Sequence, residues 1–174
     1  FWNILINGRS VLENLPLKRY EQLLHYRTIN PSLGNLSDMQ ASFLETIDTF
    51  DNDFFQVSPG DALQMDPSQR KSMEIIWHAL EDAAYSEDSL ANSKTGIFVG
   101  CASETEYKQM LRTYGYRPTA SSVLGNCFAA LSGHISHYLN LIGPNMVINT
   151  VCSSSLVAIY LASLSLLNEE CDLA

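Results

Sequence analysis

Two short and almost unbroken apolar runs constrain the fold of this chain more than any other feature. They are residues 95–100, Thr-Gly-Ile-Phe-Val-Gly, and residues 146–151, Met-Val-Ile-Asn-Thr-Val. Apolar runs without alternation are typical of strands in a parallel sheet that is covered on both faces. Helical patterns lie before, between and after the two runs. This order predicts an α/β fold with a parallel-rich sheet between helices.

The clearest helical pattern begins at Asp66. Asp66 can cap the helix, Pro67 suits its first position, and Gln69 stands where the partner of a capping box belongs. Apolar residues then recur at helical spacing, which predicts one face packed against a core. These residues are Met73, Ile76, Trp77, Leu80 and Ala84.

Other segments have weaker patterns. We expect a short helix over residues 104–113, a second long helix over about 122–139, and a last helix from Ser153 to about Asn168. Residues 1–14 form an amphipathic segment, with Phe1, Trp2, Leu5 and Leu12 available to one face, and residues 16–42 are mostly loop. Phe50, Phe54 and Phe55 form an aromatic cluster.

Composition and charge limit the class of protein. The chain has 174 residues, 46% of them hydrophobic, which suits one globular domain over residues 1–174. Its net charge of -9 opposes contact with phosphate backbones, so we do not expect nucleic acid as a partner. The sequence has no apolar run of roughly 20 residues and no signal-peptide pattern, which predicts a soluble cytoplasmic protein. Both ends of the sequence look cut, which suggests a fragment.

The four cysteines are far apart in the sequence, without a CxxC pair or the spacing of metal ligands. This pattern predicts neither a disulfide framework nor a metal site. Cys101, Cys127 and Cys171 lie in apolar segments, where a reduced cysteine commonly serves as a small buried hydrophobe. Cys152 differs because of its neighbours.

Cys152 stands at the junction between a predicted strand and a predicted helix, in Val-Cys-Ser-Ser-Ser over residues 151–155. A sharp turn of this kind exposes the side chain, and the free amides and dipole of the following helix favour a thiolate. The same amides can donate to the oxyanion of a tetrahedral intermediate. Ser153 or Ser154 can help to cap the helix. The pattern predicts acyl transfer through a thioester on Cys152.

Residues 144–162, Pro-Asn-Met-Val-Ile-Asn-Thr-Val-Cys-Ser-Ser-Ser-Leu-Val-Ala-Ile-Tyr-Leu-Ala, closely resemble the active-site segment of β-ketoacyl synthases of the polyketide and fatty acid type. The family pattern is commonly Asp-Thr-Ala-Cys-Ser-Ser-Ser-Leu-Val-Ala. The resemblance covers essentially the whole chain, in order and spacing. Further matching segments are residues 1–2, 50–55, 58–59, 65–70, 77–83, 95–100 and 133–136.

This resemblance implies a thiolase-like fold of two similar βαβαβαββ halves, with this chain as the N-terminal half, incomplete at both ends. It implies decarboxylative Claisen condensation, a homodimer, and an acyl carrier protein that delivers substrate on phosphopantetheine, with no cofactor or metal bound directly. Cys152 corresponds to the family's nucleophile. Two catalytic histidines, a lysine and a glycine-rich loop belong to the second half, so the fragment alone is expected to be inactive. The helix at Asp66 favours a modular polyketide synthase.

The sequence departs from the family pattern at a few positions. Asn149 and Val151 replace the usual Asp and Ala, His134 and His137 stand where Arg and an aromatic residue are frequent, and Tyr160 replaces a frequent His. These departures leave the substrate and the subtype open. A fatty-acid-type ketosynthase, and a noncatalytic unit that binds carrier-linked chains or mediates dimerisation, are the alternatives.

Other candidate groups have simpler interpretations. His134 and His137 share a helix face, but packing or solvation is a better explanation for them than a dyad with Cys152. His78 and His25 are expected to be structural or exposed. The acidic pairs at 51/53 and 81/82 point apart or into solvent, as expected for sequence neighbours.

Overall fold

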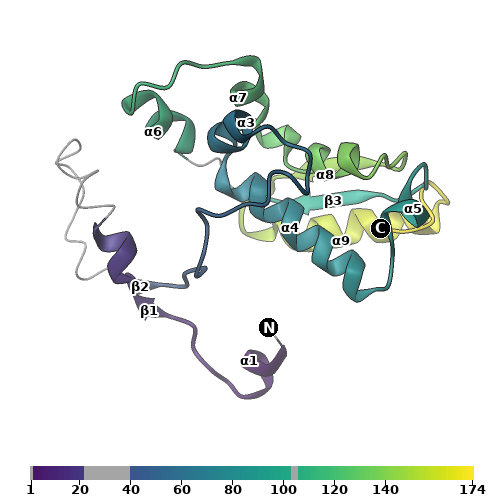
Figure 1. Ribbon diagram of the computed structural model, residues 1–174. Helices are drawn as coiled ribbons and strands as arrows, with labels where there is room; N and C mark the ends of the chain where they lie inside the picture. Colours follow the sequence, from purple (N-terminus) through teal and green to yellow (C-terminus); the bar gives the residue numbers. More distant parts are fainter. Residues whose placement is uncertain (1, 22–39, 103–105) are drawn as a thin grey trace. The chain divides into compact units, whose positions relative to one another are not determined.

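The computed structural model describes residues 2–21, 40–102 and 106–174. The chain divides into two compact units, Phe1–Ile47 and Asp48–Ala174. Figure 1 shows the elements of both units. The functional argument concerns the second unit, which contains Cys152.

The first unit has little regular structure in its described part. Helix α1 (Trp2–Ile6) has no buried residue, so the predicted apolar face of this segment is not packed. Strands β1 (Glu13–Asn14) and β2 (Gln40–Ala41) pair antiparallel. Residues 17–21 are helical, whereas residues 22–39, with most of the predicted loop and His25, lie outside the described residues.

The second unit contains the predicted parallel pairing. Strand β3 (Ile97–Gly100) pairs with β4 (Asn145–Ile148), and Gly100 lies opposite Ile148 in the register. On the other side of β3, a parallel bridge joins Thr95 to Leu173. The prediction of parallel strands is confirmed. However, β4 ends at Ile148, earlier than the apolar run suggested, because residues 149–153 turn into the next helix.

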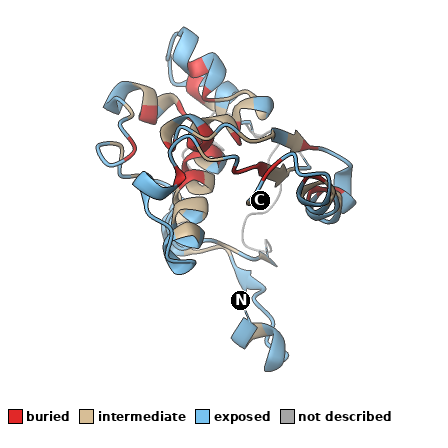
Figure 2. Ribbon diagram, turned by 90° about the vertical axis from the view of Figure 1, so that its right-hand side faces the viewer, coloured by how far each residue is buried: buried red, intermediate tan, exposed pale blue. Residues whose placement is uncertain are grey.

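Helices lie on both faces of this sheet (Figure 2). Successive residues of a strand point to opposite faces. Ile97 and Val99 join the core that includes α4 and α8, whereas Gly96 and Gly100 lie on the face toward α9 and Cys171. The sheet is therefore a middle layer between two helical layers, as the sequence predicted.

Helix α4 (Pro67–Asp82) begins where the sequence predicted. The Asp66 side chain accepts a hydrogen bond from the Ser68 amide, and Pro67 occupies the first turn. Met73 is buried, and Ile76, Trp77 and Leu80 pack against the core. Ala84 was wrongly assigned to the apolar face: it follows the helix, is exposed, and has a positive φ of 61°.

The predicted second long helix is wrong. Residues 120–138 form three short pieces, namely α7 (Ala120–Leu124), the 3-10 helix η2 (Phe128–Ala130) and α8 (Gly133–Tyr138). At the break, backbone carbonyls accept hydrogen bonds from Gln69 of α4 and from Asp66, the N-cap residue of α4. The Asp66 amide donates to Gly125 O at 2.8 Å, and Gln69 Nε2 donates to Leu124 O at 3.3 Å and Cys127 O at 3.0 Å.

These contacts also correct the expected role of Gln69. Its side chain does not return to Asp66 in a capping box but bonds to carbonyls 55 and 58 residues further along the chain. Gln69 is buried. Its side-chain amide donates hydrogen bonds to carbonyls that would accept backbone hydrogen bonds if the helix were continuous. The interruption of the helix is therefore part of how α4 and α7 pack.

The predicted aromatic cluster is confirmed and extended. The Phe50 and Phe55 rings stack with centroids 5.1 Å apart, and Phe54 meets Phe55 edge to face at 4.9 Å. Trp77 of α4 and Tyr138 of α8 complete the cluster. Aromatic contacts of this geometry add to the stability gained by burial.

The other helices of the second unit are short. They are α3 (Pro59–Gln64), α5 (Glu87–Leu90) and α6 (Tyr107–Thr113). Helix α6 confirms the short helix predicted for residues 104–113, within the described part of that range.

Candidate active site

Cys152 lies in a tight turn between β4 and the last helix. The turn is a 3-10 helix, η3 (Val151–Ser153), and it leads directly into α9 (Ser154–Leu167). Cys152 is exposed. The structure therefore confirms the predicted position of this thiol at a strand-to-helix junction.

The serines that follow Cys152 close the turn. Ser154 Oγ accepts a hydrogen bond from the Thr150 amide at 3.0 Å and donates to Val151 O at 2.6 Å. Ser153 Oγ donates to Thr150 O at 2.9 Å. The expectation that one of these hydroxyls caps α9 is wrong, because Ser153 is the N-cap residue but its side chain makes no capping bond. The amides that follow Cys152 are paired within the turn, because the Ser153 amide donates to Thr150 O at 3.3 Å and the Ser154 amide donates to Val151 O.

Val151 has a backbone conformation that is unfavourable for its residue type. Its φ of 55° lies in the left-handed region, which β-branched residues rarely adopt. Asn149 Oδ1 accepts a hydrogen bond from the Val151 amide at 3.1 Å and so holds this conformation. An aspartate at position 149 has the same acceptor, so the departure from the family pattern at Asn149 keeps this bond.

Gly100 sets how closely the end of β3 approaches the start of α9. A Cβ on Gly100 would lie 2.6 Å from the Ser155 nitrogen and 2.7 Å from the Ser154 carbonyl carbon. Only glycine permits this backbone contact, which fixes the start of α9, the helix that follows Cys152. Sequence reasoning did not single out Gly100, although a glycine inside a strand is a known signal of close backbone approach.

None of the four cysteines forms a disulfide, but their environments differ. Cys171 is buried, and burial raises the pKa of its thiol, with a hydrogen bond from Gly96 acting in the opposite direction. Cys101 and Cys127 are half-buried, whereas Cys152 is exposed. Among the four thiols, Cys152 is therefore the most accessible to a substrate.

The described histidines, His78, His134 and His137, do not form a dyad with Cys152. In the described part of the chain no hydrogen bond joins Cys152 to an imidazole, and His78 lies on the surface with its Nδ1 3.2 Å from Glu81 Oε2. His134 is partly buried in α8, and its Nε2 has no hydrogen-bond partner. Burial, and to a lesser extent the neighbouring His137, lower the pKa of His134, while a hydrogen bond with the Leu124 backbone opposes the shift.

The described residues contain neither a cluster of metal ligands nor a membrane-spanning helix. Within residues 2–21, 40–102 and 106–174, no group of three or more His, Cys, Asp or Glu side chains is arranged to hold a metal ion. Over the same ranges, each helix is too short or too polar to cross a membrane.

Comparison with known families identifies the chain. The family described as β-ketoacyl synthase, N-terminal domain, matches residues 1–174. The chain belongs to the β-ketoacyl synthase family. The resemblance noted in the sequence is thereby confirmed over its full extent.

Curated relatives of this β-ketoacyl synthase chain include polyketide synthases. One component of the phenolphthiocerol/phthiocerol polyketide synthase of Mycobacterium tuberculosis is 36% identical over 174 residues, which is 100% of this chain and 11% of that protein. The 6-methylsalicylic acid synthase of Aspergillus terreus is 34% identical over 99% of this chain and 10% of its own length. The chain thus spans about a tenth of these relatives.

Solved ketosynthase structures confirm the fold. The ketosynthase from module 6 of the bacillaene synthase of Bacillus subtilis 168 matches with a TM-score of 0.76 and 32% identity, over 98% of this chain and 26% of that one. An oxazolomycin ketosynthase domain of Streptomyces albus JA3453 matches with a TM-score of 0.76 and 29% identity, over 98% and 29%. This β-ketoacyl synthase chain is therefore an N-terminal part of a thiolase-like fold.

Proposed function

We propose that the domain containing this chain is a ketosynthase of polyketide biosynthesis that uses Cys152 as its nucleophile. The observation that carries the proposal is the exposed Cys152 thiol, held in a tight turn at the start of α9. This exposure also argues against a noncatalytic carrier-binding or dimerisation unit. The polyketide synthase relatives favour this class over a fatty-acid-type ketosynthase.

The first step is acyl transfer. The Cys152 thiolate attacks the carbonyl carbon of an acyl thioester, and the tetrahedral intermediate expels the phosphopantetheine thiolate, which takes up a proton. We infer that backbone amides of the complete domain donate to the developing oxyanion, because the Ser153 and Ser154 amides are already paired within the turn. The product is a thioester between Cys152 Sγ and the acyl chain.

The second step forms the carbon–carbon bond. A carboxylated extender thioester loses CO2, and the electron pair left on its α carbon attacks the carbonyl of the acyl-Cys152 thioester. The C–S bond breaks, Cys152 leaves as a thiolate, and the β-ketoacyl product remains on the carrier. We infer that the histidines, the lysine and the glycine-rich loop that the family uses here come from the second half of the domain.

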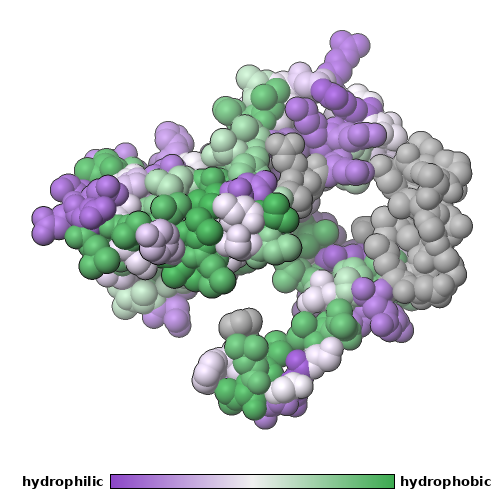
Figure 3. Space-filling view, turned by 180° about the vertical axis from the view of Figure 1, so that it is seen from behind, coloured by the Kyte–Doolittle hydropathy of each residue, from purple (hydrophilic) through white to green (hydrophobic). Residues whose placement is uncertain are grey.

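The outer face of α9 supports this dependence on further protein. Leu156, Ile159, Tyr160 and Leu167 are 73%, 63%, 60% and 78% exposed. They recur at helical spacing directly after Cys152, and Figure 3 shows hydrophobic side chains gathered on the side where α9 lies. Apolar faces of this kind are normally covered in a stable protein. We propose that the rest of the ketosynthase covers it and that this chain alone does not catalyse condensation.

Further parts of the proposal follow from family membership. An acyl carrier protein delivers substrate on phosphopantetheine, no cofactor is bound directly, and two ketosynthase domains form a homodimer in the cytoplasm. Residues 1–174 belong to one domain, which the family match over the same residues supports.

The proposal is tested with cerulenin, an electrophile that alkylates ketosynthase nucleophiles. The complete ketosynthase domain is incubated with the reagent, and the adduct is located by peptide mass spectrometry. We expect the adduct on Cys152, its loss in Cys152→Ala, and its retention in the matched control Cys127→Ala. An adduct confined to other residues of the wild type, with Cys152 unmodified, would overturn the assignment.

A further inference from the structure

The backbone that leads into Cys152 is held by side chains of the same short segment, residues 149–154. Asn149 Oδ1 accepts a hydrogen bond from the Val151 amide at 3.1 Å, and Ser154 Oγ accepts one from the Thr150 amide at 3.0 Å. The two amides just before Cys152 therefore each have a side-chain acceptor. These bonds determine the path of the chain as it approaches the thiol.

The bond from Asn149 connects the turn to the sheet. A side-chain oxygen that accepts from the amide two residues later forms an Asx turn, which mimics a backbone turn. Asn149 directly follows β4, whose last residue, Ile148, is buried and lies opposite Gly100 in the parallel pairing. The backbone of Asn149 is therefore attached to a fixed strand. Its side chain extends this constraint to Val151.

Val151 needs such a constraint because its conformation is unfavourable. Its φ of 55° lies in the left-handed region, where a β-branched side chain is rarely found. The side chain is 64% exposed, so its packing contributes little to keeping it there. Ser154 Oγ donates to Val151 O at 2.6 Å, and Asn149 Oδ1 accepts from the Val151 amide. Loss of the bond to the amide would favour a return of Val151 to a negative φ.

A change at Val151 would displace Cys152 in particular. The chain is fixed before the turn by the pairing of Ile148 with Gly100, and after the turn by the backbone contact between Gly100 and Ser155. A different φ at Val151 must therefore be absorbed by the few residues between these two points, which include Cys152. Acyl transfer requires the sulfur and the incoming carbonyl carbon to meet in one orientation.

We propose that Asn149 is a positioning residue for Cys152. Its bond to the Val151 amide keeps the turn in the conformation that presents the thiol to the acyl thioester. This inference rests on the proposed function, because it assigns Asn149 a role in the acyl-transfer step. The rate of acylation follows the fraction of molecules in which Val151 has the positive φ.

The test measures acylation of Cys152 in the complete ketosynthase domain. Each variant reacts with an acyl thioester of N-acetylcysteamine without an extender, and mass spectrometry of the intact protein follows the acyl-enzyme, with Cys152→Ala as the blank. Asn149→Leu has a similar size but no acceptor, and we expect it to react about fivefold to tenfold more slowly. Asn149→Asp retains an acceptor and should recover most of the rate. The matched control is Asn168→Leu, an exposed position at the far end of α9, which should react like the wild type.

A second background separates positioning from a general effect on folding. Glycine adopts a positive φ about as readily as a negative one, so in Val151→Gly the loss of the Asn149 acceptor should lower the rate by at most about twofold. The double variant Asn149→Leu/Val151→Gly measures this. Thermal unfolding of all the variants shows that each is folded at the temperature of the rate measurement.

The outcomes separate this inference from the proposed function. A wild-type rate in Asn149→Leu, or an equal loss of rate in the valine and glycine backgrounds, would refute the positioning role. A failure of Asn149→Asp to restore the rate would refute it as well. Absence of acylation on Cys152 in the wild type would instead contradict the proposed function itself.

Discussion

Gly100 at the end of β3 and Ser155 in the first turn of α9 are in backbone contact. A Cβ on Gly100 would lie 2.6 Å from the Ser155 nitrogen, closer than real Cβ atoms approach. The contact joins the sheet to the helix that follows Cys152. It is the tightest constraint we find on the position of the thiol.

The first prediction concerns this contact. Gly100→Ala should push α9 away from β3 and destabilise the domain by about 1–3 kcal/mol, because the added methyl meets backbone that cannot rotate away. Chemical denaturation measures the loss, and the rate of Cys152 alkylation reports the displaced turn. The control is Gly60→Ala in α3, where a Cβ would have nothing within 4 Å. Equal stability of the two variants would contradict the proposed constraint.

A second prediction concerns strain at Val151. The residue is 64% exposed and has a φ of 55°, so replacing it relieves strain with little loss of burial. Val151→Gly should raise the free energy of unfolding by about 1 kcal/mol. Val123→Gly serves as the comparison, because exposed Val123 lies in helix α7, where glycine should destabilise by a similar amount. A loss of stability in Val151→Gly would show that the turn is not strained.

A third prediction distinguishes two adjacent serines. Ser154 is buried and its hydroxyl accepts from the Thr150 amide, so Ser154→Ala leaves this amide unpaired, whereas Val151 O keeps its bond from the Ser154 amide. The expected loss of stability is about 1–3 kcal/mol. Ser155→Ala removes an exposed hydroxyl and should change stability by less than about 0.5 kcal/mol. Thermal unfolding of both variants provides the measurement, and similar shifts would rule out the hydrogen-bonding role of Ser154.

The fourth prediction is a pH dependence from His134. Burial lowers its pKa in the folded state below the ordinary value of 6.5, so the unfolded chain takes up a proton at a higher pH than the folded chain does. Stability is therefore lost as the pH falls through 6.5 toward the lower folded value. Denaturation midpoints at about pH 7.5 and about pH 5.5 measure this slope, which His134→Gln should reduce.

The control for this slope is His78→Gln, because His78 is on the surface. It should keep the pH dependence of the wild type. If His134→Gln retained the full slope over the same pH interval, another group would be responsible for the proton uptake.

Local patterns predicted several parts of the structure correctly. The Asp66 cap and the parallel pairing of β3 with β4 agree with the sequence interpretation, as does the exposed turn at Cys152. The pattern behind each prediction comes from residues close together in the chain, although the paired strands themselves are far apart in it. A cap requires neighbouring residues, and an apolar run marks a buried strand whatever its partner is.

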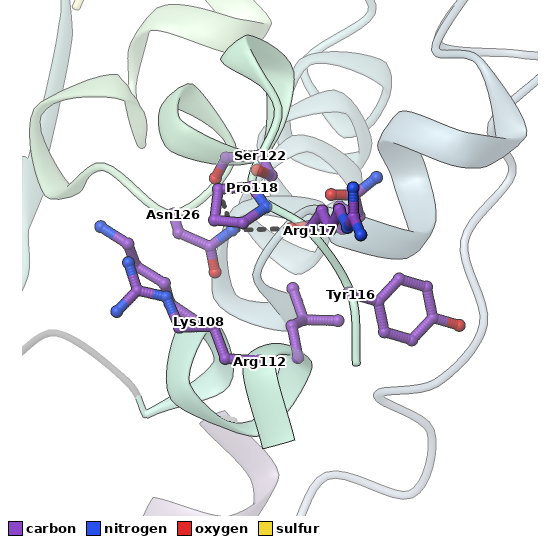
Figure 4. Close-up of a pocket in the computed structure, with 9 residues that line it drawn as sticks. Lys108, Arg112, Tyr116, Arg117, Pro118, Ser122 and Asn126 are labelled. Atoms are coloured by element: carbon purple, nitrogen blue, oxygen red, sulfur yellow. Dashed lines mark hydrogen bonds between the residues drawn. The ribbon is translucent and has the colours of Figure 1, made fainter. Parts of the chain in front are cut away.

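The errors occurred where distant residues compete for the same backbone groups. The helical pattern of residues 122–139 is interrupted because Gln69 and the Asp66 amide take carbonyls near Gly125. A small pocket between α6 and α7 (Figure 4) was not predicted, because its lining residues, Gln64, Lys108 and Asn126 among them, come from different parts of the chain. Periodicity along one segment contains no information about such contacts.

The sequence by itself determined the family, the layered α/β architecture and the position of Cys152 at a strand-to-helix junction. Only the tertiary structure decided how that junction is built, with Gly100 against Ser155 and Val151 held at a positive φ by Asn149. The physical reason is that burial and helix capping act on neighbouring residues and leave a readable pattern. Close backbone approach and shared hydrogen-bond acceptors arise only when segments far apart in the chain pack together.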